Sequence, residues 1–193
     1  MRTFIALELP AGFADEVALL SRSLARRVEG RFVRQESHHL TLAFLGDMDE
    51  TQLRRAMDAM DVAGADRDPI ALSCNGLGTF GRKGDVTLWL GLAANGALEG
   101  LAVSLRDELA QRSIPFDRKK FVPHITLARR ARVPKDSLDR LPFPLPAHAD
   151  RMTLFKSTLA PDGAIYKPLY TANLAIDPKE QPLDADQELV NHK

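Results

Sequence analysis

The chain has too little cysteine, too little net charge and too short an apolar run for several classes of protein. Cys74 is the single cysteine among 193 residues, which excludes an intramolecular disulfide and a cysteine-rich zinc site. The 26 Lys and Arg balance the 26 Asp and Glu, so a protein that coats nucleic acid through high positive charge is excluded, although a local basic cleft is not. The apolar run Phe4–Leu9 is short and contains Glu8, so we expect no signal peptide or membrane span, and a cytoplasmic location.

What remains is an ordinary globular composition, with 45% hydrophobic and 27% charged residues. The length suits one compact unit or two small lobes. We expect a single bilobal domain over residues 1–176. The polar stretch 177–193 is expected to be a solvated tail.

Hydrophobic periodicity predicts strands and helices in an order that occurs twice. Steps of three and four predict a helix from Phe13 to Val28, closed by Gly30, and further helices over residues 50–62 and Leu98–Leu109. Strand signals cover Arg2–Leu9, the surroundings of Phe32, His39–Leu45, Ile70–Leu77, Asp85–Leu92, Pro123–Ala128, Arg151–Leu159 and Ile165–Ala175, with turns at 80–84 and 161–163.

The repeat predicts an α+β fold with two lobes. Helix, loop and a strand that opens with His-x-Thr-Leu occur at His39 and again at His124, 85 positions later. Each strand is preceded by a Phe-x-Arg sequence. We therefore expect two antiparallel sheets with helices outside, related by a pseudo-twofold axis around a central cleft.

The repeated strand places chemistry on one face. Side chains alternate along a strand, so His39 and Thr41 point one way, as do His124 and Thr126, while the apolar residues between them point to the core. Two imidazoles suit general acid–base catalysis near neutral pH. Threonine hydroxyls can donate hydrogen bonds to phosphoryl oxygens, and Arg129 could hold a phosphate through its guanidinium. With no carboxylate cluster for magnesium, this set predicts metal-independent transfer at a phosphodiester.

The segments HLTLAFLG at 39–46 and PHITLAR at 123–129 resemble the paired HxTx motifs of the 2H phosphoesterase superfamily. Within it, the chain is most similar to the LigT-like RNA 2′,3′-cyclic phosphodiesterases, also called 2′-5′ RNA ligases. RTFIALELP near the start, LWLGL at 88–92 and the spaced motif SxLxPxGAxYxPL at 157–169 extend the resemblance over most of residues 1–175. Members typically have Trp-Val before the first motif, where this chain has Phe32-Val33.

The resemblance implies a reaction and roles. Such enzymes open a 2′,3′-cyclic phosphate at an RNA 3′ end to a 2′-phosphate, and the reverse direction forms a 2′-5′ bond. It implies that His124 accepts the proton of water, that His39 donates a proton to the leaving 3′-oxygen, and that Thr41 and Thr126 hold the phosphate. No cofactor or membrane is expected, the partner is RNA with a cyclic phosphate end, and we expect a monomer.

Other interpretations stay open. The site could serve a small cyclic nucleotide or a sugar cyclic phosphate, or the protein could be a non-catalytic module that binds RNA ends. A zinc site built from His38, His39, His124 and His148 lacks acidic or cysteine ligands at metal spacing.

The sequence also predicts structural or RNA-binding roles for several residues outside the two motifs. His38 faces away from His39 and is expected to be structural, and Trp89 and Phe44 are expected in the core. Tyr166 and Phe121 are candidates for stacking on a base. Residues 80–84 are a hairpin turn or a basic lip for RNA, and residues 118–120 are a solvated loop or a patch that steers phosphate.

Overall fold

The computed structural model describes residues 1–82, 85–134, 141–160 and 163–174. Its helices are α1 (Ala11–Ala25), α2 (Glu50–Gly64) and α3 (Gly96–Gln111), with the short 3-10 helix η1 (Gln35–Ser37). Its strands are β1 (Arg2–Leu7), β2 (Glu29–Phe32), β3 (Leu40–Asp47), β4 (Ile70–Leu72), β5 (Cys74–Arg82), β6 (Asp85–Leu92), β7 (His124–Arg132), β8 (Ala147–Ala149), β9 (Arg151–Ala160) and β10 (Gly163–Asn173). No helix in these ranges is long and apolar enough to cross a membrane.

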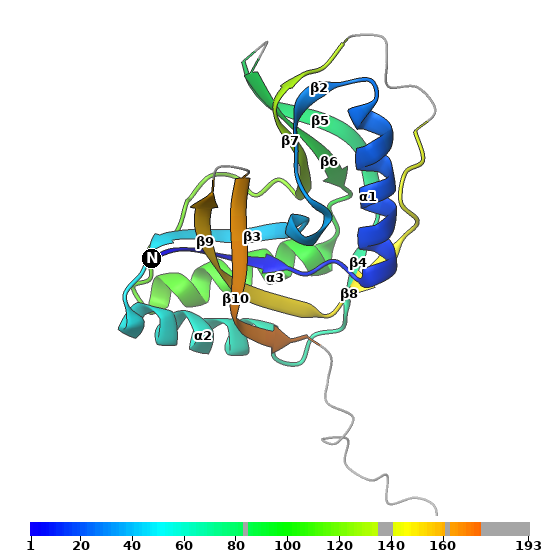
Figure 1. Cartoon of the computed structure of the whole chain (residues 1–193). Coiled ribbons are helices and arrows are strands. Elements are labelled where there is room, and N and C mark those ends of the chain that lie inside the picture. Colours follow the sequence, from blue (N-terminus) through cyan, green and yellow to red (C-terminus); the bar gives the residue numbers. More distant parts are fainter. Residues whose placement is uncertain (83–84, 135–140, 161–162, 175–193) are drawn as a thin grey trace, which may run out of the picture.

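The main sheet is antiparallel and has two halves (Figure 1). The first half has the order β10-β9-β1-β3, and the second contains β2, β7, β6 and β5. Within the described strands, β3 and β7 are joined by a single residue pair, Leu40 with Ile125. Strands β4 and β8 form a separate two-stranded sheet. The predicted bilobal α+β fold is therefore confirmed, with the two predicted sheets joined edge to edge at one point.

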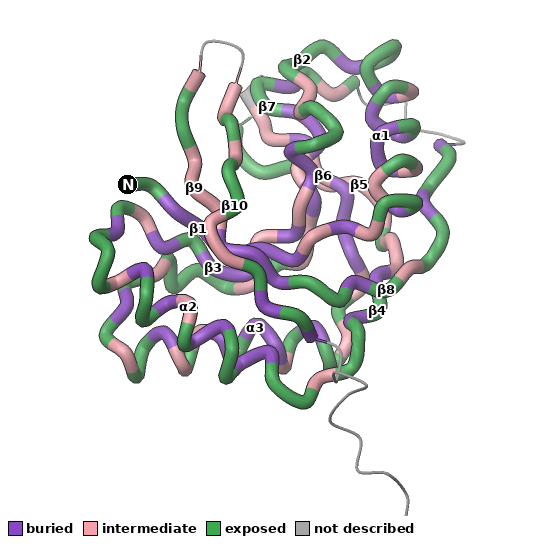
Figure 2. The backbone as a smooth tube through the Cα atoms, turned by 60° about the horizontal axis from the view of Figure 1, so that its bottom comes forward, coloured by how far each residue is buried: buried purple, intermediate pink, exposed green. Residues whose placement is uncertain are grey.

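Helices cover one side of each half and leave the other side for a site. Helix α2 packs against β9 and β10, and α3 packs against β3, so both lie on the same face of the first half (Figure 1). Helix α1 packs against β2 of the second half. Figure 2 shows that buried residues are concentrated where the strands meet these helices. The core comprises the apolar partners of the repeated motif, among them Leu40, Leu42, Ile125 and Leu127, each fully buried.

Local signals explain where the helices begin. Asp49 caps α2, because its carboxylate accepts the backbone N–H of Gln52 while the Gln52 side chain accepts the N–H of Asp49. Asn95 caps α3 through the N–H of Leu98. These caps agree with the helices expected over residues 50–62 and 98–109.

Two sequence predictions about elements were wrong. The helix from Phe13 ends at Ala25, and Gly30 lies in β2 instead of closing the helix. A Cβ at Gly30 would lie 3.1 Å from the Cα of Ala131, so close strand approach explains this glycine. The strand expected over Ile70–Leu77 is two strands, β4 and β5, which belong to different sheets.

The predicted turns and the predicted C-terminal tail fall partly or wholly outside the residues that the structure describes. Phe80, Gly81 and Arg82 lie in β5, so most of the expected turn at 80–84 is strand. Residues 83–84 and 161–162 of the two expected turns, and the expected tail 177–193, lie outside the described residues. The expected domain boundary at residue 176 stays a prediction.

Candidate active site

The two motif histidines occupy equivalent places at the joint between the halves. His39 directly precedes β3 and His124 begins β7. The residues that follow them, Leu40 and Ile125, are the pair that joins the two strands. Because side chains alternate, both histidines emerge on the face opposite this buried pair.

Both rings are oriented in the same way. The Nδ1–H of His39 donates to the carbonyl oxygen of Ser37 at 2.8 Å, and the Nδ1–H of His124 donates to the carbonyl oxygen of Val122 at 2.6 Å. A carbonyl can only accept, so Nδ1 carries the proton in each ring. The Nε2 atoms are therefore the ones that can exchange protons with a ligand.

A β-bulge in β3 changes which residues face the site. In the pairing with β1, Thr41 and Ala43 have partners and Leu42 is skipped. Leu42 and Ala43 are both buried, so the alternation shifts by one residue. Phe44 consequently returns to the face of Thr41 and is 41% exposed.

The same bulge occurs in β7, again three residues after the histidine. In the pairing with β6, Thr126 and Ala128 have partners and Leu127 is skipped. Leu127 and Ala128 are buried, and Arg129 is exposed. The bulge therefore turns Arg129 toward the face that carries Thr126, in the position equivalent to Phe44 of the first half.

These side chains surround one cavity of about 590 Å³. Its lining brings together all five residues that the sequence predicts as catalytic or phosphate-binding: His39, Thr41, His124, Thr126 and Arg129. The predicted stacking candidates Tyr166 and Phe121 also line it, as do Lys119 and Lys120 of the basic loop. The cavity thus combines two imidazoles, two hydroxyls and four cations with one carboxylate, Asp117, which is paired with Lys119, and the excess of positive charge suits an anionic ligand.

His39 lies in an apolar and positively charged environment. Its ring centroid is 4.8 Å from that of Phe4 and 5.1 Å from that of Tyr166, which meets it edge-on. Its pKa is lowered to about 4, mainly by burial; the Ser37 carbonyl opposes the shift and the charge of Arg129 adds to it. Without an anion in the cleft, His39 is therefore neutral at pH 7.

His38 takes the structural position expected for it. Its side chain is 8% exposed, and neither ring nitrogen has a hydrogen-bond partner among the described residues. Burial lowers its pKa to about 4, so the ring is held in its neutral form. Within the described ranges, no three His, Cys, Asp or Glu side chains are grouped to hold a metal ion. His148 lies in β8, in the small separate sheet, whereas His39 and His124 lie at the joint of the main sheet. The structure therefore gives no support to a zinc site built from the four histidines.

The prediction that Trp89 and Phe44 belong to the core was wrong. Trp89 is only partly buried, and its ring centroid is 5.9 Å from that of His124. Phe80 also borders His124, at 5.0 Å between centroids. Trp89 lies between Leu88 and Leu90, both buried, so strand alternation already indicated that it faces the other side. Phe44 could not be placed in this way because the bulge reverses its direction.

Sequence reasoning missed Arg106 on α3. Its Nε–H donates to the carbonyl oxygen of Leu42, the bulged residue, at 3.2 Å, and its terminal N–H donates to the carbonyl of Lys119 at 3.2 Å. Its guanidinium also lies over the Phe121 ring, 5.5 Å from the centroid. Arg106 thereby connects the helix layer, the bulge and the basic loop. An arginine on the partly buried side of a predicted helix was the available signal.

Known proteins share this fold and sequence pattern. A crystal structure of Escherichia coli LigT complexed with 3′-AMP superposes with a TM-score of 0.75 at 28% identity, covering 91% of this chain and 98% of that one. The structure of TT0787 from Thermus thermophilus gives a TM-score of 0.71 at 30% identity, covering 90% and 98%.

Relatives named RNA 2′,3′-cyclic phosphodiesterase also match this chain over most of its length. An RNA 2′,3′-cyclic phosphodiesterase of Thermotoga maritima is 33% identical over 88% of this chain and 94% of its own length. One from Methanocaldococcus jannaschii is 26% identical over 86% and 97%. The sequence model of the 2′-5′ RNA ligase superfamily matches residues 13–160, a range that contains both histidine motifs. Fold, site geometry and sequence together show that the chain belongs to the 2′-5′ RNA ligase superfamily.

Proposed function

We propose that this protein is a hydrolase that opens 2′,3′-cyclic phosphate ends of RNA and leaves 2′-phosphate ends. The observation that carries the proposal is the pair of histidines with equal ring orientation in one cavity with two threonines and an arginine. Several relatives bear the name RNA 2′,3′-cyclic phosphodiesterase, which supports this substrate.

The proposed step uses the two Nε2 atoms. The Nε2 of His124 takes a proton from water, whose oxygen forms a bond to phosphorus. The bond between phosphorus and the 3′-oxygen breaks, and the protonated Nε2 of His39 donates its proton to that oxygen. The product carries a 2′-phosphate and a free 3′-hydroxyl.

Thr41, Thr126 and Arg129 stabilise the phosphoryl group in this proposal. Each threonine hydroxyl donates a hydrogen bond to a non-bridging oxygen, and the guanidinium binds the developing negative charge. The alternation of each strand supports these roles because it places threonine two residues from histidine on the same face.

The donor role of His39 requires a protonated ring at the pH of the reaction. Its low pKa of about 4 arises from burial and from neighbouring positive charge. A phosphodiester anion bound beside the ring neutralises that field and raises the pKa of His39. NMR titration of the ring with and without inorganic phosphate tests this proposal, which predicts a higher pKa in the presence of phosphate.

We further propose that the step needs no metal ion, because two imidazoles already supply the acid and the base. We also propose the 2′-5′ ligase activity as the same step with another nucleophile: a 5′-hydroxyl in place of water gives its proton to Nε2 of His124 and bonds to phosphorus, the bond to the 3′-oxygen breaks, His39 protonates that oxygen, and a 2′-5′ linkage forms. The physical requirement is only that a 5′-hydroxyl reaches Nε2 of His124.

The decisive experiment is turnover of an RNA oligonucleotide that ends in a 2′,3′-cyclic phosphate, with and without prior EDTA treatment. We expect hydrolysis to the 2′-phosphate at the same rate in both samples. Activity that requires one particular divalent ion would overturn metal independence. Binding without turnover would support the alternative of an RNA-end binding module, and turnover of a cyclic mononucleotide in clear preference to the oligonucleotide would support the small-molecule alternative.

A further inference from the structure

A second cavity, of about 440 Å³, adjoins the active site. We call it the arginine pocket, because Arg2, Arg31, Arg34 and Arg129 all line it and its described lining contains no carboxylate. Its volume lies in the range of about 300–1,000 Å³ that is usual for small-ligand sites. Phe44, Arg129 and Tyr166 line both cavities, so a ligand can extend from one into the other.

Two arginines of the pocket, Arg31 and Arg129, lie close enough for their positive charges to repel each other. Arg31 of β2 lies directly opposite Arg129 of β7, so the two guanidinium groups leave the same face of the sheet from adjacent positions. Like charges directly opposite each other destabilise a strand pair. Neither side chain has an ion-pair partner among the described residues. An anion between them would relieve this repulsion.

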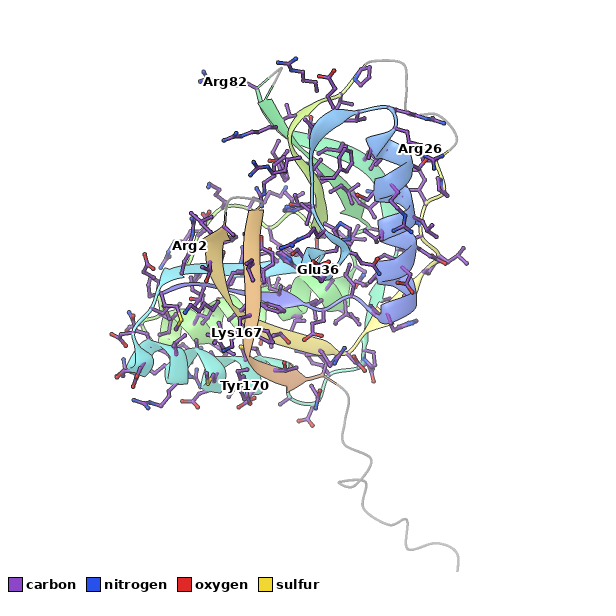
Figure 3. All side chains as sticks on the ribbon, viewed as in Figure 1. Arg2, Arg26, Glu36, Arg82, Lys167 and Tyr170 are labelled. Atoms are coloured by element: carbon purple, nitrogen blue, oxygen red, sulfur yellow. The ribbon has the colours of Figure 1, made fainter. Side chains whose placement is uncertain are left out.

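The other two arginines extend the same positive surface. Arg2 lies at the start of β1, beside the β9–β10 hairpin (Figure 3), and it too has no ion pair within the described part of the chain. Arg34 forms an ion pair with Glu36, with 3.2 Å between Nε and Oε1. Glu36 itself does not line the pocket. Phe32 adds an aromatic surface next to these cations, so the pocket offers a contact for a base as well as for phosphate.

The pocket lies on the His39 side of the active site. Its lining includes Ser37, whose carbonyl orients His39, and Tyr166, which meets the His39 ring edge-on. In the proposed reaction His39 protonates the 3′-oxygen, which belongs to the ribose of the RNA strand itself. Water is activated at His124 in the proposed reaction, and Val122, Phe80 and Trp89, which orient or border the His124 ring, do not line the pocket. The pocket is therefore next to the body of the RNA strand and not next to the nucleophile.

We propose that the arginine pocket binds the phosphate that links the terminal nucleotide to its 5′ neighbour, together with that neighbouring nucleoside. The proposal rests on the proposed function and adds its substrate class: cyclic ends that carry a 5′-phosphate or a longer chain. Arg31 and Arg2 contact this second phosphate, and Arg129 lies between it and the reacting one.

The test compares four substrates with one cyclic end: a nucleoside 2′,3′-cyclic phosphate with a 5′-hydroxyl, the same with a 5′-phosphate, a dinucleotide, and a dinucleotide with a neutral methylphosphonate linkage. We expect kcat/KM to rise about tenfold or more when the 5′-phosphate or the charged linkage is present, the scale of a charge-assisted contact. The neutral dinucleotide should lose most of this gain. Added salt should reduce the gain because it screens exposed charges.

Substitutions of the pocket arginines test whether the gain in kcat/KM arises in the arginine pocket. Arg31→Gln and Arg2→Gln should each remove most of the gain while changing turnover of the 5′-hydroxyl mononucleotide by less than about twofold. Arg54→Gln, at an exposed position of α2 on the helix-covered face, is the matched control and should keep the whole gain.

The outcomes separate this inference from the proposed function. Equal kcat/KM for all four substrates, or a gain that survives in the methylphosphonate and in both pocket variants, overturns the arginine pocket while leaving cyclic phosphate hydrolysis in place. Failure to hydrolyse any of the four substrates overturns the proposed function, and the inference with it.

Discussion

Gly78 controls the position of an aromatic ring that borders the second histidine. It lies opposite Trp89 in the β5–β6 pairing. A Cβ at position 78 would lie 2.1 Å from Cζ2 and 2.2 Å from Cη2 of the indole. Carbon atoms in contact are normally about 3.5–4.0 Å apart, so Gly78→Ala requires the indole to move by more than about 1 Å.

The displaced indole has little room. Its ring centroid is 5.0 Å from that of Phe80 and 5.9 Å from that of His124, so movement toward the cleft disturbs the base proposed for catalysis. Overpacking of this kind typically lowers the free energy of unfolding by about 1–3 kcal/mol. A displacement of about 1 Å near reacting groups can lower kcat by up to about 100-fold, so we expect kcat/KM of Gly78→Ala to fall at least about tenfold.

Tryptophan fluorescence can follow the movement of the indole, because Trp89 is the only tryptophan in the sequence. Its fluorescence emission reports the indole environment directly, and urea unfolding and kcat/KM complete the measurement. Gly12→Ala in α1 is the control, since a Cβ there meets nothing within 4 Å and should change none of the three readouts adversely. Unchanged emission, stability and kcat/KM in Gly78→Ala would refute the reasoning that Gly78 makes room for the indole.

Three further predictions concern charged and titratable groups. His39→Ala and His124→Ala should each lower turnover of a cyclic-phosphate oligonucleotide by about 100-fold or more without loss of circular dichroism; near-normal rates in either folded variant would remove that histidine from the mechanism. Arg129→Ala should raise KM, lower kcat or both, whereas unchanged kinetics would make it a surface arginine. The pKa of His38 and of His39 is about 4 in the folded protein against 6.5 as the ordinary value, so the unfolded chain binds more protons below pH 6.5. Stability should therefore fall as pH decreases from about 6.5 to about 4 and should be independent of these groups above that range. The stability of His38→Leu, measured by urea unfolding, should fall less over the same window, and an equal fall would exclude His38 as a source.

The sequence identifies residues that line one cavity in the structure, but it does not show how the strands around that cavity are arranged. A histidine and a threonine two positions apart share a face in any regular strand, so the pairs at 39–41 and 124–126 required no knowledge of the fold beyond strand alternation. Their convergence followed from the repeat, because two equivalent strands that meet at a pseudo-twofold axis place equivalent residues face to face.

The bulges account for the main failure at the site. A bulge inserts a residue without changing the hydrophobic pattern in any distinctive way, since Leu42-Ala43 and Leu127-Ala128 look like ordinary strand. Regular alternation after Thr41 therefore places Phe44 in the core, although it is 41% exposed in the structure. Arg129 lines the cavity, as its spacing from the motif suggests, but the reason that it reaches the cleft is the bulge, which the spacing alone does not show.

Longer-range pairing was also beyond the sequence. The break between β4 and β5 depends on where the partners of each strand lie. Strand β4 pairs with β8, a strand of three residues that directly follows Pro142, Pro144 and Pro146 and carries no strong strand signal. Arg106 bonds to the carbonyl of Leu42, 64 positions earlier in the chain, a contact that no local pattern encodes.

The first half of the sheet is assembled from opposite ends of the chain. Strand β1 lies between β3 and β9, and β9 and β10 are the last strands described. During synthesis β1 therefore has an unpaired edge until residues 151–160 leave the ribosome, although its residues 4–7 are apolar and buried in the finished protein. A nonsense mutation between β7 and β9 would yield a fragment that contains both histidines, and we expect that fragment to aggregate through this edge instead of retaining partial activity.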